Sequence, residues 1–153
     1  MKYLIGSSLD FHNTKFIKGY VSQIGLVSIK TNYKIIAESD GDIVIHALGD
    51  AILGALGKKD IGEYFTKKDM ISNKSSLKIL DFCLLLMKKE KLQISNVDIT
   101  IISDHIMINK FRSQIKEKLV EKLNCSKVNI KATRWENINN FKVGCLCSLL
   151  LRD

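Results

Sequence analysis

The chain has 153 residues, of which 46% are apolar and 26% are charged, and it contains no proline. These values fit one domain over residues 1–153 that buries a core without needing a metal or a disulfide to hold it together. The formal net charge of +8 leaves two interpretations open: a surface that attracts phosphate or nucleic acid, or a solvated face of scattered lysines. Because no long basic run is present and few aromatic residues are interleaved with the lysines, we expect no nucleic-acid partner.

Several features bear on the compartment. Residues 1–9 lack the long apolar core of a signal peptide, and no apolar run approaches the ~20 residues of a membrane helix. The four cysteines form no C-x-x-C pair, and we expect packed, reduced thiols. They are Cys83, Cys125, Cys145 and Cys147. We therefore expect a protein of the cytoplasm, or of a plastid-type organelle if the source is eukaryotic, that has no membrane partner.

The first predicted elements are strands followed by a helix. A short strand is expected at residues 1–5, and one or two strands are expected within residues 16–36, with a break at Gly25. Residues 39–56 predict a helix. Its ends are marked by a Ser39-x-x-Asp42 capping box and by a stop at Gly57.

The middle of the chain is predicted as a loop and a second helix. Residues 58–73 are expected to form the loop, with one helical turn near residues 62–65. Residues 75–89 predict the helix because apolar side chains recur at helical spacing. These side chains are Leu77, Leu80, Leu84 and Met87.

The last third alternates between strands and a helix. The β-branched, alternating stretch at residues 96–103 predicts a strand, and residues 127–133 and 143–151 predict two more. Residues 109–123 predict an amphipathic helix with one apolar stripe. The stripe consists of Phe111, Ile115, Leu119 and Leu123. This order of elements favours a mixed sheet with helices packed on one face.

Three side chains have the chemistry of a metal site. Asp10 and His12 are two residues apart and would point the same way in an extended segment. His46 lies in the first turns of the predicted helix. A carboxylate and two imidazoles can bind zinc and leave a fourth position open. The alternative is that Asp10-x-His12 is a chance pair and that His46 is a partly buried side chain with ordinary hydrogen bonds.

Other polar residues carry weaker signals. Asp42 and Asp50 could accept the second N–H of a metal-bound histidine, or they could simply solvate one helix face. Asp60 to Gly62 could hold a ribose hydroxyl or form a turn. Near the end of the predicted strand at residues 127–133 stand two phosphate-type donors and a ligand for a hard metal ion. They are Thr133, Arg134 and Glu136.

Five stretches together resemble the 2-C-methyl-D-erythritol 2,4-cyclodiphosphate synthase family of the non-mevalonate isoprenoid pathway. They match the family in order and spacing across nearly the whole chain, and S-D-G-D-x-x-x-H-A-L-x-D-A is the most specific motif. The stretches are IGSSLDFH at 5–12, SDGDIVIHALGDAILGALG at 39–57, KDIGEYF at 59–65, NVDITII at 96–102 and VNIKAT at 128–133.

The resemblance implies a fold, an assembly and a reaction. The fold would be an α/β (α+β), ferredoxin-like subunit whose mixed four-stranded sheet has helices on one face, with a small β-hairpin. The assembly would be a homotrimer with active sites between neighbouring subunits. The enzyme would be a phosphorus–oxygen lyase that acts on 4-diphosphocytidyl-2-C-methyl-D-erythritol 2-phosphate. The 2-phosphate attacks the β-phosphorus, CMP leaves, and a cyclic diphosphate forms.

The resemblance also implies roles for individual residues. Zn²⁺ would be bound by Asp10, His12 and His46, and a second ion, Mg²⁺ or Mn²⁺, by Glu136. The substrate contacts would come from Asp10, His12, Ser39, Asp60, Ile61, Gly62, Thr133 and Glu136, with the ribose at residues 60–62 and a phosphate at Ser39.

The chain departs from the family pattern at several positions. Glu38 replaces a histidine and Arg134 replaces a threonine, and in the family these two positions steady the transferring phosphoryl group. Residues 103–109 lack the lysine and proline of the family's cytosine loop, and Lys142 stands near the place of an arginine. Two functions follow as hypotheses: a divergent cyclodiphosphate synthase, or a zinc-binding trimer with lost or altered activity that binds another phosphorylated or isoprenoid ligand.

Overall fold

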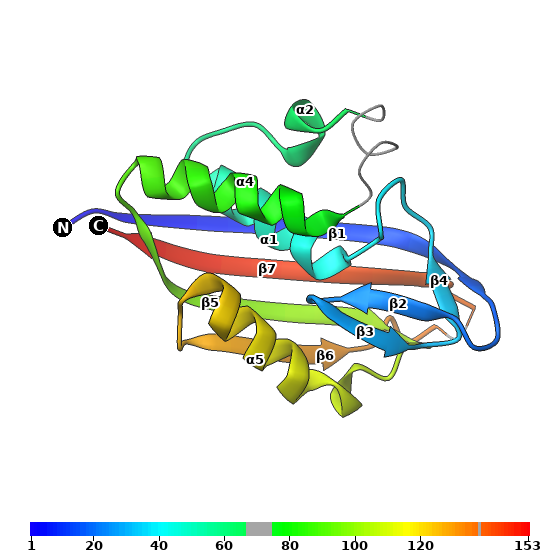
Figure 1. Cartoon of the computed structure of the whole chain (residues 1–153). Helices are drawn as coiled ribbons and strands as arrows, with labels where there is room; N and C mark the ends of the chain where they lie inside the picture. The colour runs from blue at the N-terminus through cyan, green and yellow to red at the C-terminus, as the bar shows by residue number, and fades with distance from the viewer. Residues whose placement is uncertain (67–74, 138) are drawn as a thin grey trace.

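A mixed sheet with helices on one face forms the frame of the molecule (Figure 1). The computed structural model describes residues 1–66, 75–137 and 139–153. The N- and C-termini lie side by side at one end of the sheet. The expected α+β class and the helices on one face are therefore confirmed. No described helix has the length and apolar character that a bilayer crossing requires.

The elements follow one another in the predicted order. They are β1 (Tyr3–Phe16), β2 (Val21–Ile24), β3 (Val27–Lys30), β4 (Tyr33–Ile35), α1 (Ile43–Ala55), α2 (Ile61–Tyr64), α4 (Ser76–Lys89), β5 (Gln93–Ser103), η1 (Ile108–Lys110), α5 (Arg112–Leu123), β6 (Val128–Thr133) and β7 (Lys142–Arg152). The helical turn expected near residues 62–65 is α2. The part of the predicted loop from residue 67 to 73 lies outside the described residues.

The sheet contains five strands among the described residues, in the order β4-β1-β7-β5-β6. β5 and β6 are parallel, and the pairs β1–β7, β5–β7 and β1–β4 are antiparallel. The prediction of four strands is therefore wrong by one. The extra strand, β4, has three residues, which is too few for a periodic pattern to reveal it.

Strand β1 is much longer than the predicted strand at residues 1–5, because it runs for 14 residues. It pairs with β7 from Tyr3↔Arg152 to Asn13↔Lys142. Its middle carries Ser8, Asp10 and His12 on the side that faces the helices, and Ser8 donates to the Ala47 carbonyl of α1. The apolar side chains of Leu9 and Phe11 lie on the opposite, exposed face, so this strand has polar residues facing the helices, the reverse of the usual alternation.

Helix α1 begins later than predicted, because its N-cap is Asp42 and not Ser39. The Asp42 carboxylate accepts a hydrogen bond from Ile45 N at 3.2 Å, so the expected capping box is wrong. The same carboxylate accepts from Gly25 N and Leu26 N, both at 2.8 Å. These two residues have φ of +59° and +66° and form the turn between β2 and β3, which is the break expected at Gly25. The end predicted at Gly57 is confirmed by its φ of +65°.

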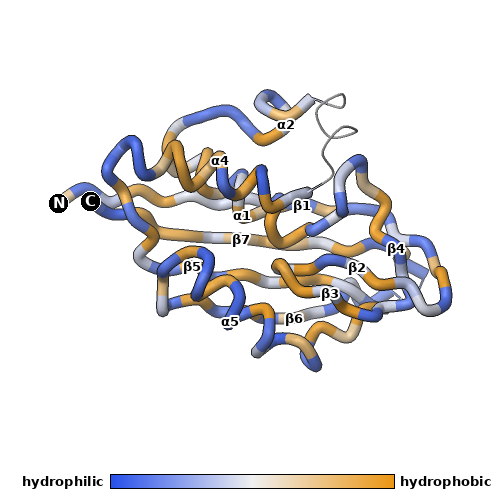
Figure 2. The backbone as a smooth tube through the Cα atoms, in the orientation of Figure 1, coloured by the Kyte–Doolittle hydropathy of each residue, from blue (hydrophilic) through white to orange (hydrophobic). Residues whose placement is uncertain are grey.

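The core lies between the sheet and the helices. A Cβ on Gly6 of β1 would lie 1.9 Å from the Ala51 carbonyl oxygen, so this glycine permits α1 to sit directly on the strand. Hydrophobic and hydrophilic residues alternate along α4, which has one buried and one exposed face (Figure 2). Leu80, Leu84 and Met87 are buried there as predicted, but Leu77 is 38% exposed. The four cysteines are buried free thiols, as expected.

Candidate metal centre

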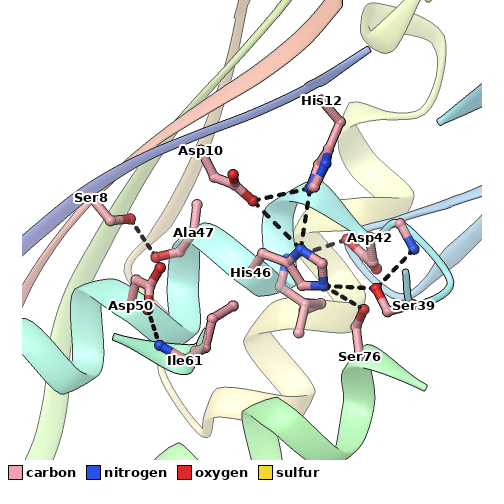
Figure 3. A network of polar contacts seen from close by, with 12 residues as sticks. Ser8, Asp10, His12, Ser39, Asp42, His46, Ala47, Asp50, Ile61 and Ser76 are labelled. Atoms are coloured by element: carbon pink, nitrogen blue, oxygen red, sulfur yellow. Dashed lines mark hydrogen bonds and ion pairs between the residues drawn. The ribbon is translucent and has the colours of Figure 1, made fainter. Parts of the chain in front are cut away.

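Two of the predicted ligands come from β1. Asp10 and His12 point to the same side of the strand, as the two-residue spacing predicted. The distance from Asp10 Oδ2 to His12 Nε2 is 3.3 Å. The strand thus presents a carboxylate and an imidazole together toward α1 (Figure 3).

The third predicted ligand comes from the first turn of α1. His46 Nδ1 lies 3.4 Å from Asp10 Oδ2 and 3.4 Å from His12 Nε2. His46 is 6% exposed, and its ring meets the ring of His12 edge-on with centroids 5.5 Å apart. Among the described residues, this is the one group of three or more potential ligands that could hold a metal ion.

The spacing of these donor atoms fits a tetrahedral ion. In a zinc site with bonds of about 2.0–2.1 Å, neighbouring donors lie about 3.3–3.4 Å apart, and the three distances between Asp10, His12 and His46 are 3.3, 3.4 and 3.4 Å. The donor set of two imidazoles and one carboxylate also fits zinc and leaves one position for an exogenous ligand.

The electrostatics favour a carboxylate ready to bind a cation. Burial acts to raise the pKa of Asp10, but hydrogen bonds with His12 and His46 and the charge of both rings outweigh it and hold the pKa well below its usual range. The carboxyl group is therefore ionised at neutral pH, as a metal ligand must be.

The outer side of His46 faces two hydroxyl groups. His46 Nε2 lies 3.0 Å from Ser39 Oγ and 3.1 Å from Ser76 Oγ, on the side of the ring away from Asp10 and His12 (Figure 3). Sequence reasoning missed Ser76, because it lies 30 residues from His46 and no local pattern joins the two. A serine pair at the start of a helix was the one available signal.

Asp42 and Asp50 support the surroundings of the site without touching the imidazoles of His12 or His46. Asp42 is 1% exposed and holds the β2–β3 turn, so it does not solvate a helix face. Asp50 accepts a hydrogen bond from Ile61 N at 2.7 Å and so anchors the start of α2. Burial raises the pKa of both carboxyls. One of the two interpretations was that Asp42 or Asp50 accepts the second N–H of a ligand histidine. This interpretation is wrong, because Ser39 and Ser76 are the groups that face His46 Nε2.

A cavity of about 280 Å³ opens beside the three ligands. Four other predicted site residues line it together with His12 and His46, and they are Glu38, Ser39, Ile61 and Gly62. Asp60 is the N-cap of α2 and accepts a hydrogen bond from Glu63 N. The structure thus brings the predicted metal ligands, phosphate contact and ribose contacts to one place.

The remaining predicted residues lie elsewhere in the subunit. Thr133 ends β6, and it lines a separate cavity of about 100 Å³ with Arg134 and the segment that begins at Ser103. Glu136 follows in the loop after β6, with a φ of +59°. β6 is at the far edge of the sheet, separated from β1 by β7 and β5. Strands are about 4.8 Å apart, so β1 and β6 lie about 14 Å apart across the sheet.

Comparison with known proteins agrees with this arrangement. Residues 3–151 match the sequence model of the YgbB family. The chain belongs to the YgbB family. It is 40% identical to the 2-C-methyl-D-erythritol 2,4-cyclodiphosphate synthase of Mycoplasmoides gallisepticum, with 99% of this chain and 97% of that one covered. It is 36% identical to the enzyme of the same name from Aquifex aeolicus, with 99% and 98% covered.

Two solved structures share the fold. A CDP complex of IspF from Plasmodium falciparum superposes with a TM-score of 0.84 at 31% identity, covering 97% of this chain and 95% of that one. The bifunctional IspDF of Campylobacter jejuni superposes with a TM-score of 0.88 at 26% identity, covering 98% of this chain and 42% of that one.

Proposed function

We propose that this YgbB-family chain cyclises 4-diphosphocytidyl-2-C-methyl-D-erythritol 2-phosphate to 2-C-methyl-D-erythritol 2,4-cyclodiphosphate and releases CMP. The observation that carries this proposal is the tetrahedral spacing of Asp10, His12 and His46 beside a cavity, in a chain 40% identical to a synthase of that name. The activity is that of a phosphorus–oxygen lyase in isoprenoid precursor synthesis.

We propose a homotrimer in which neighbouring subunits complete each site. The face of the sheet opposite the helices carries large apolar side chains that are 44–78% exposed in one subunit. They are Tyr3, Ile5, Leu9, Phe11 and Leu146. An apolar face of this kind favours association, and a closed ring of three subunits would place the β6 edge of one chain against the β1 side of the next.

The residues then divide the reaction between them. In the cyclisation, an oxygen of the 2-phosphate forms a bond to the β-phosphorus, while the bond to the CMP oxygen breaks and CMP takes the electron pair. Asp10, His12 and His46 would hold Zn²⁺, and Glu136 of the neighbouring chain would hold Mg²⁺ or Mn²⁺. These ions supply neutralisation of the diphosphate charge when bound.

The protein groups position the substrate around that charge. Ser39 offers a hydroxyl to a phosphate oxygen, and residues 60–62 offer the turn at α2 to the ribose. Thr133 and Arg134 offer donors from the adjacent chain, and a guanidinium presents several N–H groups to a phosphoryl oxygen. Alignment of the attacking and leaving oxygens is the main contribution that such groups make.

A second function is favoured by one observation. Glu38 lines the same cavity as His12 and His46, and a carboxylate there repels a diphosphate. A zinc-binding trimer that has lost cyclisation and binds another phosphorylated or isoprenoid ligand is the alternative.

Turnover of the expected substrate separates the two functions. The purified protein is mixed with the cytidine-diphosphate substrate, Zn²⁺ and Mg²⁺, and phosphorus NMR follows CMP and the cyclic diphosphate. We expect both products to appear together. Stoichiometric zinc without either product would reject the synthase and support the alternative.

A further inference from the structure

Ser76 and Asp40 form a hydrogen-bonded chain that reaches His46 on the side of its ring away from Asp10 and His12. Ser76 is the first residue of α4 and is 1% exposed. Its backbone N–H donates to Asp40 Oδ2 at 3.0 Å, and its hydroxyl donates to Asp40 Oδ1. Asp40 therefore caps α4 from 36 residues away, while the N-cap residue Ser75 makes no side-chain cap bond.

The hydroxyl of Ser76 has one proton, and this fixes what it can offer to His46. A carboxylate accepts hydrogen bonds and does not donate them, so the Ser76 proton goes to Asp40. What remains on Ser76 Oγ toward His46 Nε2, 3.1 Å away, is a lone pair. A hydrogen bond between Ser76 and His46 therefore requires the proton of His46 to be on Nε2.

Ser39 does not make this choice. Its Oγ lies 3.0 Å from the same His46 nitrogen and accepts a hydrogen bond from Gly41 N at 3.2 Å. Its own proton is not committed to any carboxylate in the hydrogen bonds of the described residues, so the hydroxyl can either donate to Nε2 or accept from it. The Ser39 hydroxyl can therefore bond with either tautomer of His46, whereas the Ser76 hydroxyl bonds only with the Nε2–H tautomer.

A neutral imidazole has one N–H, so a proton on Nε2 leaves a lone pair on Nδ1. Nδ1 is the atom that faces Asp10 Oδ2 and His12 Nε2, so in the metal-free protein the Asp10 carboxylate competes with Ser76 for the one proton of His46. We propose that Asp40, acting through Ser76, is a positioning residue that selects the Nε2–H tautomer of His46 and so keeps Nδ1 free to bind the metal. This inference rests on the proposed function and adds a residue that orients its metal ligand.

Replacing Asp40 by asparagine reverses the direction of this hydrogen-bond chain. Two backbone N–H groups donate to the Asp40 carboxylate, Ser76 N to Oδ2 at 3.0 Å and Asp42 N to Oδ1 at 3.2 Å, and we expect the shorter of the two bonds to take the amide oxygen of the new side chain. The NH₂ group then faces Ser76 Oγ and donates to it, which frees the Ser76 proton to point at His46 Nε2. Asparagine is about as good a helix cap as aspartate, so Asp40→Asn changes the tautomer and retains the start of α4.

The tautomer is read in metal-free protein labelled with ¹⁵N-histidine, at a pH of about 8.5, where ordinary imidazoles are neutral. Long-range ¹H–¹⁵N spectra distinguish Nδ1–H from Nε2–H. We expect a larger Nε2–H population at His46 in the parent protein than in Asp40→Asn, because in the variant Ser76 no longer offers Nε2 a fixed acceptor while Asp10 still faces Nδ1. Zn²⁺ titration should show an affinity loss of roughly 10–100-fold in that variant.

Two further variants keep the test decisive. Ser76→Ala leaves Asp40 able to cap the backbone N–H but removes the fixed acceptor, so a measurable Nδ1–H population should appear, with a smaller affinity loss. Asp81→Asn removes one negative charge from α4, where Asp81 pairs with Lys122, and should change neither the tautomer nor the Zn²⁺ affinity.

The outcomes are distinct from those of the functional test. An unchanged His46 tautomer in folded Asp40→Asn, or in Ser76→Ala if Asp40→Asn does not fold, would overturn the inference. Equal affinity losses in Asp40→Asn and Asp81→Asn would also overturn it, because charge alone would then explain the effect. Absence of cyclic product in the parent protein would reject the proposed synthase and leave the tautomer result unaffected.

Discussion

The predicted site residues form two groups, one on the β1 side of the sheet and one at the β6 edge. Within one chain, the two groups differ in how many of their polar atoms have a partner. On the β1 side, each ligand atom meets another ligand atom at 3.3–3.4 Å. At the β6 edge, Thr133 and Arg134 line a cavity with Asp104, whose Oδ2 is buried without a hydrogen-bond partner in the described part of the chain.

This difference indicates how the protein distributes its chemistry. The three proposed ligands contact one another within one subunit, so we expect them to hold an ion before any substrate arrives. At the β6 edge, Asp104 Oδ2 has no hydrogen-bond partner among the described residues. This fits a surface whose polar groups bind a substrate or another chain. The predictions below test this division, from the largest expected effect to the smallest.

Loss of a ligand on the β1 side should have the largest effect. We expect His46→Ala to lose bound Zn²⁺ and all turnover, because two donors remain of three. Metal content by elemental analysis and product formation by phosphorus NMR measure both effects. His105→Ala is the matched control, because His105 stacks between Tyr33 and Phe141 and lies outside the ligand group, so it should retain the metal. A full zinc load in His46→Ala would reject the ligand assignment.

Mixed trimers test whether two chains share a site. We expect His46→Ala and Arg134→Ala each to lose turnover when alone. Refolded together in equal amounts, they should regain activity in about one site in four, since half of the β1 sides and half of the β6 edges are intact and pair at random. No recovery in mixed trimers of confirmed composition would place both groups of residues in the same chain's site.

A change at Glu38 sharpens the comparison within the β1 side. We expect Glu38→His to leave turnover equal or to raise it, because it removes a carboxylate from the cavity that the diphosphate would enter. Steady-state kinetics give kcat and KM separately. A large loss of kcat in this variant would instead assign an active role to Glu38.

The smallest effect is expected between the two regions, on the face of the sheet away from the helices. A hydrogen bond from Lys131 lowers the pKa of Asp98. A lowered pKa contributes stability above the ordinary pKa of about 4, and this stability is lost as pH falls through the folded-state pKa. Both side chains are about half exposed, so the contribution is at most about 1 kcal/mol.

Urea unfolding of Asp98→Asn and of the parent protein checks this at two pH values. We expect the difference in unfolding free energy to be largest at neutral pH and to shrink toward zero as Asp98 becomes protonated in acid. A difference that grows in acid would contradict the sign of this linkage.

His46 lies 34 residues after His12, and its place in the ligand group was expected from the family resemblance. Asp10 and His12 were predictable as a pair because they are two residues apart on a strand, which is a local signal. The helices were predictable for the same reason, since their apolar residues recur at 3.6-residue spacing.

What could not be predicted depends on contacts distant in sequence. The bond from Ser76 to Asp40 joins residues 36 positions apart, and Asp42 reaches back to Gly25 and Leu26. Nothing near Asp42 indicated that its carboxylate serves a hairpin turn as well as the helix start. The length of β1 was hidden because the residues that serve the site replace apolar ones on its inward face.

The most direct test is diffraction from crystals grown with Zn²⁺, recorded on both sides of the zinc absorption edge. We predict one anomalous peak per subunit, which marks a Zn²⁺ ion bonded to Asp10 Oδ2, His12 Nε2 and His46 Nδ1 at about 2.0–2.2 Å. A peak bound elsewhere, or a bond to His46 through Nε2, would contradict the account.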